Sequence, residues 1–271
     1  MKRYKKVLIV GARSKFTKPL VKLMSPLSDQ IILHSRRPLA KNDSDSELKI
    51  HGEFATHVHL ISECDLIIYL AGVHGYGSNQ SKPWSFFYYN NVEALLGFIR
   101  CLSPQRLSKF IYISSTDVYN YKSTETITEQ TKTAPQNLYG LSKVFAEMCV
   151  ISSCQAAKIP YAIARLGPAY GVDTDKTLGL GKLLRDLISH KPVIVKNGDN
   201  QLALLSLNEV AEAMVSLADA NLKIANIIGC DASLKVFVKA FCSQVNSNSS
   251  TDWQSDGNPI KLNFKRTIIA E

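Results

Sequence analysis

The chain contains 271 residues, of which 45% are hydrophobic and 20% are charged, a composition that is ordinary for a globular protein and gives no support for long-range disorder. Its 32 Lys and Arg residues outnumber its 23 Asp and Glu residues, so the formal net charge is +9. Because the basic residues are scattered and are not interleaved with aromatic residues on one predicted surface, we expect a phosphorylated small ligand as the acidic partner, and no nucleic acid.

Short runs of apolar, mostly β-branched residues recur along the first two thirds of the chain and are typical of buried strands. Between them lie longer stretches with helical spacing, such as 20–27 and 92–99. Strands that alternate with helices indicate parallel strands joined by crossover helices. The pattern predicts an α/β fold with a doubly wound, parallel Rossmann sheet. The predicted strands are residues 7–10, 30–34, 66–70, 109–114 and 161–165.

In the last third of the chain the periodic stretches become shorter. Helical spacing predicts helices at 183–187 and 209–217, and short apolar runs predict strands at 193–195 and 224–228. The segment 246–259 is rich in Ser, Asn, Asp and Gly and is expected to be a loop.

The first predicted strand leads into a turn, Gly11 to Thr17, where a dinucleotide-binding fold has three glycines that let the backbone approach a pyrophosphate. Only the first glycine is present. Ser14 and Thr17 are small enough to take the other two positions, and their hydroxyl groups can cap a helix or contact a phosphate. The turn predicts cofactor contacts from Gly11, Arg13, Ser14 and Phe16, and it is also compatible with an ordinary strand-to-helix connection.

The second predicted strand ends in His34, Ser35, Arg36 and Arg37, where an NAD-binding site would present an acidic residue to the ribose hydroxyl. Two arginines without an acid suit a 2′-phosphate. Arg36, with Arg13 as a further contact, therefore favours NADP over NAD. A solvated basic turn explains the same residues equally well.

Small or hydroxylated residues end the next two predicted strands. Leu70, Ala71 and Gly72 would let a cofactor lie against the edge of the third strand, and the fourth strand ends in Ser114 and Ser115. Ligands of parallel sheets bind at the carboxyl ends of the strands. We therefore expect both groups to lie at a ligand-binding edge.

Tyr139 and Lys143 are four residues apart, which on a helix places them on one face, one turn apart. There a lysine ammonium can lower the pKa of the tyrosine and hold a ribose hydroxyl, while a serine such as Ser115 orients a substrate oxygen. Random placement of the chain's tyrosines and lysines yields about one such pair. The weight of this pair comes from its position after a strand that ends in hydroxyl groups.

With these features in order, the chain resembles the extended short-chain dehydrogenase/reductase family, which includes NAD-dependent, sugar-nucleotide-modifying epimerases, dehydratases and reductases. The resemblance runs from Val7 to about Gly229. Tyr139 and Lys143 match the family's YxxxK pair, and Ser115 matches its catalytic serine or threonine. Further segments that resemble the family are Asn91-Val92, Arg165 to Gly171 and Asn226 to Gly229.

The resemblance implies an NAD(P)-dependent epimerase or reductase that acts on a sugar nucleotide. Tyr139 would exchange a proton with the substrate oxygen while hydride passes to or from the nicotinamide. Lys143 would bind the ribose and tune Tyr139, Ser115 would hold the substrate oxygen, and Asn91 would join the cofactor-binding residues. Relatives commonly pair through helices beside the YxxxK helix, so a homodimer is expected.

The resemblance also implies two structural units. Residues 1–166 together with approximately 203–228 would form the NAD(P)-binding Rossmann domain. Residues 167–202 and 229–271 would form a C-terminal substrate-binding lobe. This lobe is expected to be small, because relatives usually continue into further helices.

The chain departs from the family pattern at several positions. Ser14 and Thr17 replace two glycines, Pro168 stands where an asparagine usually faces the sugar nucleotide, and Leu202-Ala203 replaces a common Arg-Asp pair. These departures leave a second hypothesis open, a non-catalytic module that senses a dinucleotide or binds a partner protein. Within the enzymatic hypothesis, an NADP preference favours a reductase, whereas an epimerase would retain NAD.

The remaining patterns concern the compartment. The apolar run after the first lysines ends at Gly11, short of the ~7–15 residues of a signal-peptide core, and no run reaches the ~18 apolar residues of a membrane span. The six cysteines lack CxxC spacing and suit reduced thiols. The six histidines show no metal-ligand pattern. We expect a cytoplasmic protein without a metal or a membrane partner.

Overall fold

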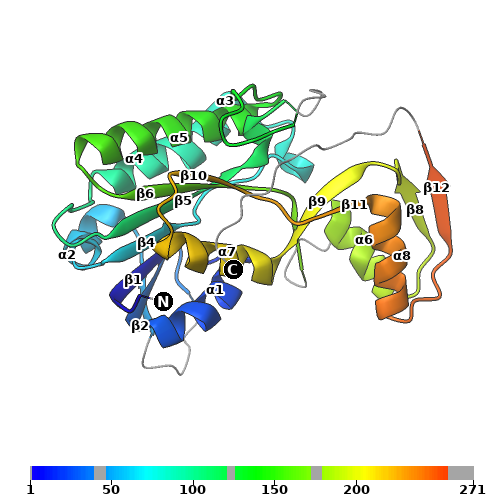
Figure 1. Ribbon diagram of the computed structural model, residues 1–271, viewed down its shortest axis with the longest axis horizontal. Coiled ribbons are helices and arrows are strands. Elements are labelled where there is room, and N and C mark those ends of the chain that lie inside the picture. The colour runs from blue at the N-terminus through cyan, green and yellow to red at the C-terminus, as the bar shows by residue number, and fades with distance from the viewer. Residues whose placement is uncertain (1, 40–46, 121–125, 172–178, 256–271) are drawn as a thin grey trace.

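The computed structural model describes residues 2–39, 47–120, 126–171 and 179–255. Its largest element is a seven-stranded sheet in the order β10-β6-β5-β4-β1-β2-β3, in which all neighbouring strands are parallel (Figure 1). The predicted doubly wound Rossmann sheet is confirmed. Its strands are β1 (Tyr4–Val10), β2 (Ser28–Ser35), β3 (Glu47–His51), β4 (Leu66–Tyr69), β5 (Lys109–Ser115), β6 (Tyr161–Leu166) and β10 (Ile224–Ile227).

The strand order reverses at β1, which pairs with β2 on one side and with β4 on the other. Val10 is in register with His34 of β2 and with Tyr69 of β4. The carboxyl ends of these three strands therefore lie side by side. In open parallel sheets, a reversal of this kind creates the crevice where ligands bind.

One face of the sheet is covered by α1 (Thr17–Met24) and α7 (Leu207–Asp219) (Figure 1). Leu20 and Met214 of these helices belong to one buried apolar cluster with Ile9 of β1. Successive strand residues point to opposite faces of a sheet, so the neighbours of Ile9 in β1, Leu8 and Val10, face the other layer.

The opposite face is covered by α4 (Ala94–Ile99) and α5 (Leu138–Ala156). Here Leu8 of β1 lies in a second buried cluster with Phe98 and Val150. The strands are therefore apolar on both sides, which explains why they appear in the sequence as continuous apolar runs.

The helical run Trp84 to Ile99 contains a π-turn. It consists of α3 (Trp84–Phe87), the π-turn η4 (Tyr88–Glu93) and α4. Such turns occur often at functional sites because they re-aim side chains. This one carries Asn90, which accepts a hydrogen bond from Arg36 just after β2, and Asn91, which accepts one from Val73 in the segment after β4.

The other strands form two small sheets beside two helices, seen on the right of Figure 1. The sequence predicted a loop over 246–259, and this is wrong in part, because residues 251–254 pair in parallel with β8. Trp253 of that strand packs against a cluster that contains Val195 and Val238. These elements are β7 (Ala169–Tyr170), α6 (Gly179–Ile188), β8 (Val193–Lys196), β9 (Gln201–Ser206), β11 (Cys230–Ser233), α8 (Leu234–Gln244) and β12 (Thr251–Gln254).

The strand β9 of the small sheet leads directly into α7 of the main layer. Ser206 and Glu209 form a capping box there, in which each side chain accepts a hydrogen bond from the other's backbone NH. The predicted lobe segments 172–178 and 256–271 lie outside the described residues, and the two-unit boundaries stay a prediction. The short helices are η1 (Ser25–Leu27), η2 (Phe54–His57), α2 (Val58–Ser62), η3 (Gly77–Asn79) and η5 (Thr116–Val118).

Candidate active site

The turn after β1 is held against the ends of both neighbouring strands. The backbone NH groups of Gly11 and Ala12 each donate a hydrogen bond to the His34 carbonyl at 2.9 Å. Gly11 has a φ of +91°, and a Cβ at this position would lie 2.6 Å from the Ala71 backbone nitrogen. Only glycine fits this approach. The single glycine that the turn retains therefore lies where the backbone passes closest to Ala71.

The two hydroxyl residues of the turn lie at the start of α1. The Ser14 hydroxyl accepts a hydrogen bond from the Phe16 NH at 3.3 Å, and the Ser14 carbonyl accepts one from the Thr17 NH at 3.0 Å. The Thr17 hydroxyl is buried and has no hydrogen-bond partner within the described residues. A buried, unpaired hydroxyl at a helix start is suited to meeting an anion.

Basic side chains surround this turn. Arg36 is exposed, and its Nη2 donates to the Asn90 Oδ1 of the π-turn at 3.1 Å. Arg13 is also exposed. Lys15, which the sequence did not single out, donates to the Ala169 carbonyl at 3.1 Å, and burial lowers the pKa of its ammonium.

The end of β4 meets Asn91 and Lys143. The Asn91 Oδ1 accepts from the Val73 NH at 2.7 Å, while its Nδ2 donates to the Ser142 hydroxyl at 2.9 Å. A Cβ at Gly72, whose φ is +148°, would lie 2.8 Å from the Asn91 Oδ1 and 3.7 Å from the Lys143 Nζ. The predicted residues Gly72, Asn91 and Lys143 therefore lie together, beside Leu70 and Ala71.

The predicted catalytic residues also converge. Asn137 caps α5, since its Oδ1 accepts from the Gly140 NH at 2.7 Å, and this cap starts the helix so that Tyr139 and Lys143 face the sheet. The Lys143 Nζ lies 6.0 Å from the centroid of the Tyr139 ring. The Ser115 side chain hydrogen-bonds to that of Tyr139. All three side chains of the trio are buried.

Burial is the largest cause of the pKa shifts of Tyr139 and Lys143. It raises the pKa of the Tyr139 phenol, the Asp117 charge raises it further, and the hydrogen bond from Ser115 opposes both. Burial lowers the pKa of Lys143 to about 8, against the attraction of Glu147. At neutral pH the phenol is therefore protonated and the ammonium is charged. A lowering of the Tyr139 pKa by Lys143 stays a prediction.

The sequence did not single out the aromatic cover of this site. The Tyr76 hydroxyl donates to both carboxylate oxygens of Asp117 at 3.0 Å, and the Asp117 NH donates to the Ser115 hydroxyl at 3.2 Å. A Cβ at Gly75 would lie 2.4 Å from the Tyr139 Cβ. The loop after β4 thus lies directly on Tyr139.

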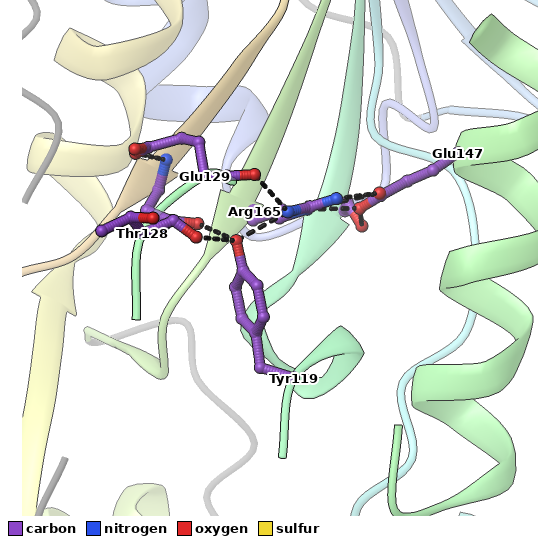
Figure 2. A network of polar contacts seen from close by, with 7 residues as sticks. Tyr119, Thr128, Glu129, Glu147 and Arg165 are labelled. Carbon is purple, nitrogen blue, oxygen red and sulfur yellow. Dashed lines mark hydrogen bonds and ion pairs between the residues drawn. The ribbon is translucent and has the colours of Figure 1, made fainter. Parts of the chain in front are cut away.

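A buried polar network, part of which is drawn in Figure 2, involves the helix and the strand that carry the trio. Glu147 accepts from Ser114 at 2.5 Å and forms an ion pair with Arg165 at 2.7 Å. The Arg165 Nη1 donates to the Tyr119 hydroxyl at 2.6 Å, and that hydroxyl donates to the Asn226 Oδ1 at 2.8 Å. The network joins α5, β5, β6 and β10 through Glu147, Ser114, Arg165 and Asn226, and Ser114 directly precedes Ser115.

Two further features of the described residues bear on function. The described residues include no group of three or more His, Cys, Asp or Glu side chains able to hold a metal ion. In that part of the chain, every helix is too short or too polar to cross a membrane.

The chain is similar to known proteins in sequence and in fold. The model of the NAD dependent epimerase/dehydratase family matches residues 7–228. An uncharacterized UDP-glucose epimerase of Bacillus subtilis (strain 168) is 25% identical over 142 residues, 52% of this chain and 44% of that protein. A dTDP-D-glucose 4,6-dehydratase of Dictyostelium discoideum is 24% identical over 176 residues, 60% of this chain and 40% of that protein. These matches span less than half of each relative.

Solved structures share the fold at lower identity. UDP-glucuronic acid 4-epimerase from Bacillus cereus, in complex with UDP-glucuronic acid and NAD, has a TM-score of 0.78 at 17% identity, covering 97% of this chain and 90% of that one. UDP-N-acetylglucosamine 4-epimerase from Methanobrevibacter ruminantium M1, in complex with UDP-N-acetylmuramic acid, has a TM-score of 0.83 at 15% identity, covering 97% and 89%.

Proposed function

The chain belongs to the NAD dependent epimerase/dehydratase family, and from this premise we propose that it is an NAD(P)-dependent epimerase or reductase acting on a sugar nucleotide. Tyr139 exchanges a proton with the substrate oxygen, Ser115 holds that oxygen, and Lys143 holds the cofactor ribose. The observation that carries the proposal is the convergence of these three buried side chains beside the reversal point of the sheet.

The residues around that reversal point fit a dinucleotide. Gly11 presents bare backbone against Ala71, and the start of α1 adds NH groups and the buried Thr17 hydroxyl, which suit a pyrophosphate. Gly72 leaves space beside Lys143. The bound nicotinamide supplies the acceptor or donor of hydride.

The proton chemistry follows from the ionisation of the trio. Because its pKa is raised, the Tyr139 phenol carries a proton at neutral pH and can donate it to a carbonyl oxygen. In the opposite direction Tyr139 must take a proton from a hydroxyl group, and the Ser115 hydrogen bond stabilises the phenolate that does so. The Lys143 ammonium adds a positive charge on the same helix face.

The choice of dinucleotide separates the two reactions. The Bacillus cereus neighbour holds NAD, which suits an epimerase that recycles a bound cofactor. The exposed guanidinium groups of Arg36 and Arg13 support the preference for NADP, and hence a reductase, because they can neutralise a 2′-phosphate.

We also propose a homodimer. Phe145 and Met148 are exposed apolar residues on α5, and Tyr89 is exposed on the adjoining π-turn. Trp84 lies 5.6 Å from Phe145, measured between ring centroids, and extends the same surface. A second copy of this chain would cover these side chains, because burial of exposed apolar surface favours association.

The cytoplasm is the proposed compartment. Within the described residues, the free thiols are Cys64, Cys101, Cys149, Cys154 and Cys242. Free thiols of this number suit a reducing environment. The region 167–202 with 229–271 is proposed as the substrate-binding lobe.

Mass spectrometry of small molecules released from the purified protein tests the function, followed by turnover assays on a panel of sugar nucleotides. Tyr139→Phe should retain the cofactor and lose about 10²–10⁴-fold of turnover, the usual contribution of a general acid or base. Full turnover by Tyr139→Phe would show the mechanism to be wrong. Dinucleotide binding without hydride transfer across the panel would instead identify a non-catalytic sensor module.

A further inference from the structure

The Lys143 side chain enters the layer between α5 and the sheet, where β5 supplies its partners. Its Nζ donates to the Ile113 carbonyl at 2.9 Å and to the Tyr112 hydroxyl at 3.2 Å. The same nitrogen lies 4.9 Å from the centroid of the Tyr112 ring. An ammonium has three donors, and the described residues accept two of them, so one donor is left for a ligand.

Tyr112 is fully buried in the middle of the sheet. Tyr69 of β4 is its partner in register, and the two ring centroids are 6.1 Å apart. The Tyr69 hydroxyl is also buried but has no hydrogen-bond partner within the described residues. The two tyrosines thus share cross-strand register and burial, but only the Tyr112 hydroxyl accepts a hydrogen bond from Lys143.

We propose that Tyr112 is a positioning residue for Lys143: its hydroxyl and the Ile113 carbonyl hold the ammonium where it can bind the cofactor ribose and face Tyr139. This inference rests on the function proposed above and extends it by a residue outside the trio. Tyr112 acts through Lys143, and the strand that carries it also carries Ser115 three residues later.

The Tyr112 hydroxyl matters because few other groups stabilise the Lys143 charge. The attraction of Glu147 raises the pKa of Lys143, but that carboxylate is itself bound by Ser114 and Arg165. Burial raises the pKa of the Tyr112 phenol, so it remains a neutral acceptor. The other titratable groups around the pair are Tyr139 and Cys149 on α5, Tyr69 on β4 and Asp117 after β5.

Removal of the Tyr112 hydroxyl should lower the pKa of Lys143 below its present value of about 8. A buried ammonium that loses one of two acceptors is less stable in its charged form. A hydrogen bond to a charged group is strong enough to move a pKa by about one unit. Lys143 would then lose its proton within the neutral range.

The test compares Tyr112→Phe with Tyr69→Phe, a matched control that removes one buried hydroxyl from the neighbouring strand. Lys143 is titrated by NMR in cofactor-free protein carrying ¹³C-labelled lysine, and its signal is identified by its loss in Lys143→Met. In Tyr112→Phe the pKa of Lys143 should be about one unit lower than in the wild type. In Tyr69→Phe it should equal the wild-type value. Equal titration of Tyr112→Phe and the wild type would overturn the proposal.

A second variant guards against a Tyr112→Phe protein that does not fold. Site-specific 3-fluorotyrosine at position 112 keeps the hydroxyl but makes it a weaker acceptor, so the Lys143 pKa should move in the same direction by a smaller amount. An unchanged titration in this protein would also overturn the proposal.

The readouts separate this inference from the proposed function. The NMR titration needs neither cofactor nor turnover, so a shifted Lys143 in a protein that turns over no sugar nucleotide contradicts the proposed function and leaves the role of Tyr112 standing. In an active protein, the alkaline limb of the kcat/KM profile should move to lower pH in Tyr112→Phe. An active protein whose limb and titration both stay unchanged contradicts the role of Tyr112 alone.

Discussion

The carboxylate of Glu147 and the guanidinium of Arg165 form a two-point ion pair inside the fold (Figure 2). Arg165 donates from Nη2 to Oε2 at 2.7 Å and from Nε to Oε1 at 3.0 Å. The two side chains are only 4% and 5% exposed. Glu147 follows Lys143 by one helical turn, so this pair anchors the helix that carries Tyr139 and Lys143, two of the proposed catalytic residues.

Removing one partner of this pair should be more harmful than removing both. Glu147→Leu should lower the free energy of unfolding by about 3–5 kcal/mol, because it leaves the Arg165 charge buried without a partner. The double variant Glu147→Leu/Arg165→Met should recover much of that loss. Urea denaturation measures both values, and an equal loss in the single and double variants would contradict this account.

The burial of the charged Lys143 side chain should lower the free energy of unfolding. Its pKa falls from 10.5 to about 8 in the folded protein, so the unfolded chain binds more protons between about pH 8 and 10.5, and stability should rise with pH across that window. Below pH 8 the full cost is present. Lys143→Met should therefore abolish turnover and stabilise the protein at pH 7 by up to about 3 kcal/mol.

Urea denaturation at pH 7 and at pH 10.5 checks this prediction. The gap between Lys143→Met and the wild type should narrow at the higher pH. Lys239 is an exposed lysine on α8, and Lys239→Met should give no such gap. A Lys143→Met protein less stable than the wild type at pH 7 would refute the expected cost of burial.

Gly11→Ala should lower the stability of the protein by more than backbone strain alone explains. Alanine at this φ of +91° is strained, and its Cβ would also clash with Ala71 at 2.6 Å. Gly52 has a comparable φ of +104° but has open space around it. Gly52→Ala should thus show the strain alone, about 1–2 kcal/mol.

Dinucleotide titration and urea denaturation of the two glycine variants separate these effects. Gly11→Ala should lose more stability than Gly52→Ala and should also bind the dinucleotide more weakly. Equal stability losses with unchanged dinucleotide binding would remove Gly11 from the cofactor site.

Arg36→Ala should weaken NADP binding while leaving NAD binding nearly unchanged. A charge-assisted hydrogen bond to a phosphate is worth about 1.5–3 kcal/mol, which corresponds to about 10–150-fold in Kd. Arg106 is also exposed and precedes β5, at the amino end of that strand, so Arg106→Ala is the matched control. Calorimetric titration with both dinucleotides measures the ratio, and a parallel loss for NAD and NADP would argue against 2′-phosphate recognition.

Met148→Glu should separate the proposed dimer, because it places a charge in the apolar surface formed with Phe145 and Tyr89. Val236 on α8 is similarly exposed, at 58% against 62% for Met148. Val236→Glu should leave the assembly intact. Sedimentation velocity reports the mass of each variant, and a wild type that sediments as a monomer at all concentrations would dismiss the dimer.

The central strands and their helices could be predicted because their signals are local. Residues 66–69 are all apolar and read as a buried strand without any knowledge of their neighbours. Strand β3 was missed because only Leu48 and Ile50 of its five residues are apolar. Strand β12 was missed because its residues are polar apart from Trp253, and its pairing depends on β8, more than fifty residues earlier.

The sequence by itself determined the alternation of apolar strands and helices, the glycine turn at Gly11 and the spacing of Tyr139 and Lys143, because each depends on residues close together in the chain. Tertiary structure alone decided what surrounds the trio. Tyr112 and Lys143 are 31 residues apart, and Tyr76 and Asp117 are 41 apart. The pKa directions of the site depend on burial and on such distant partners, and these exist only once the strands and helices have packed.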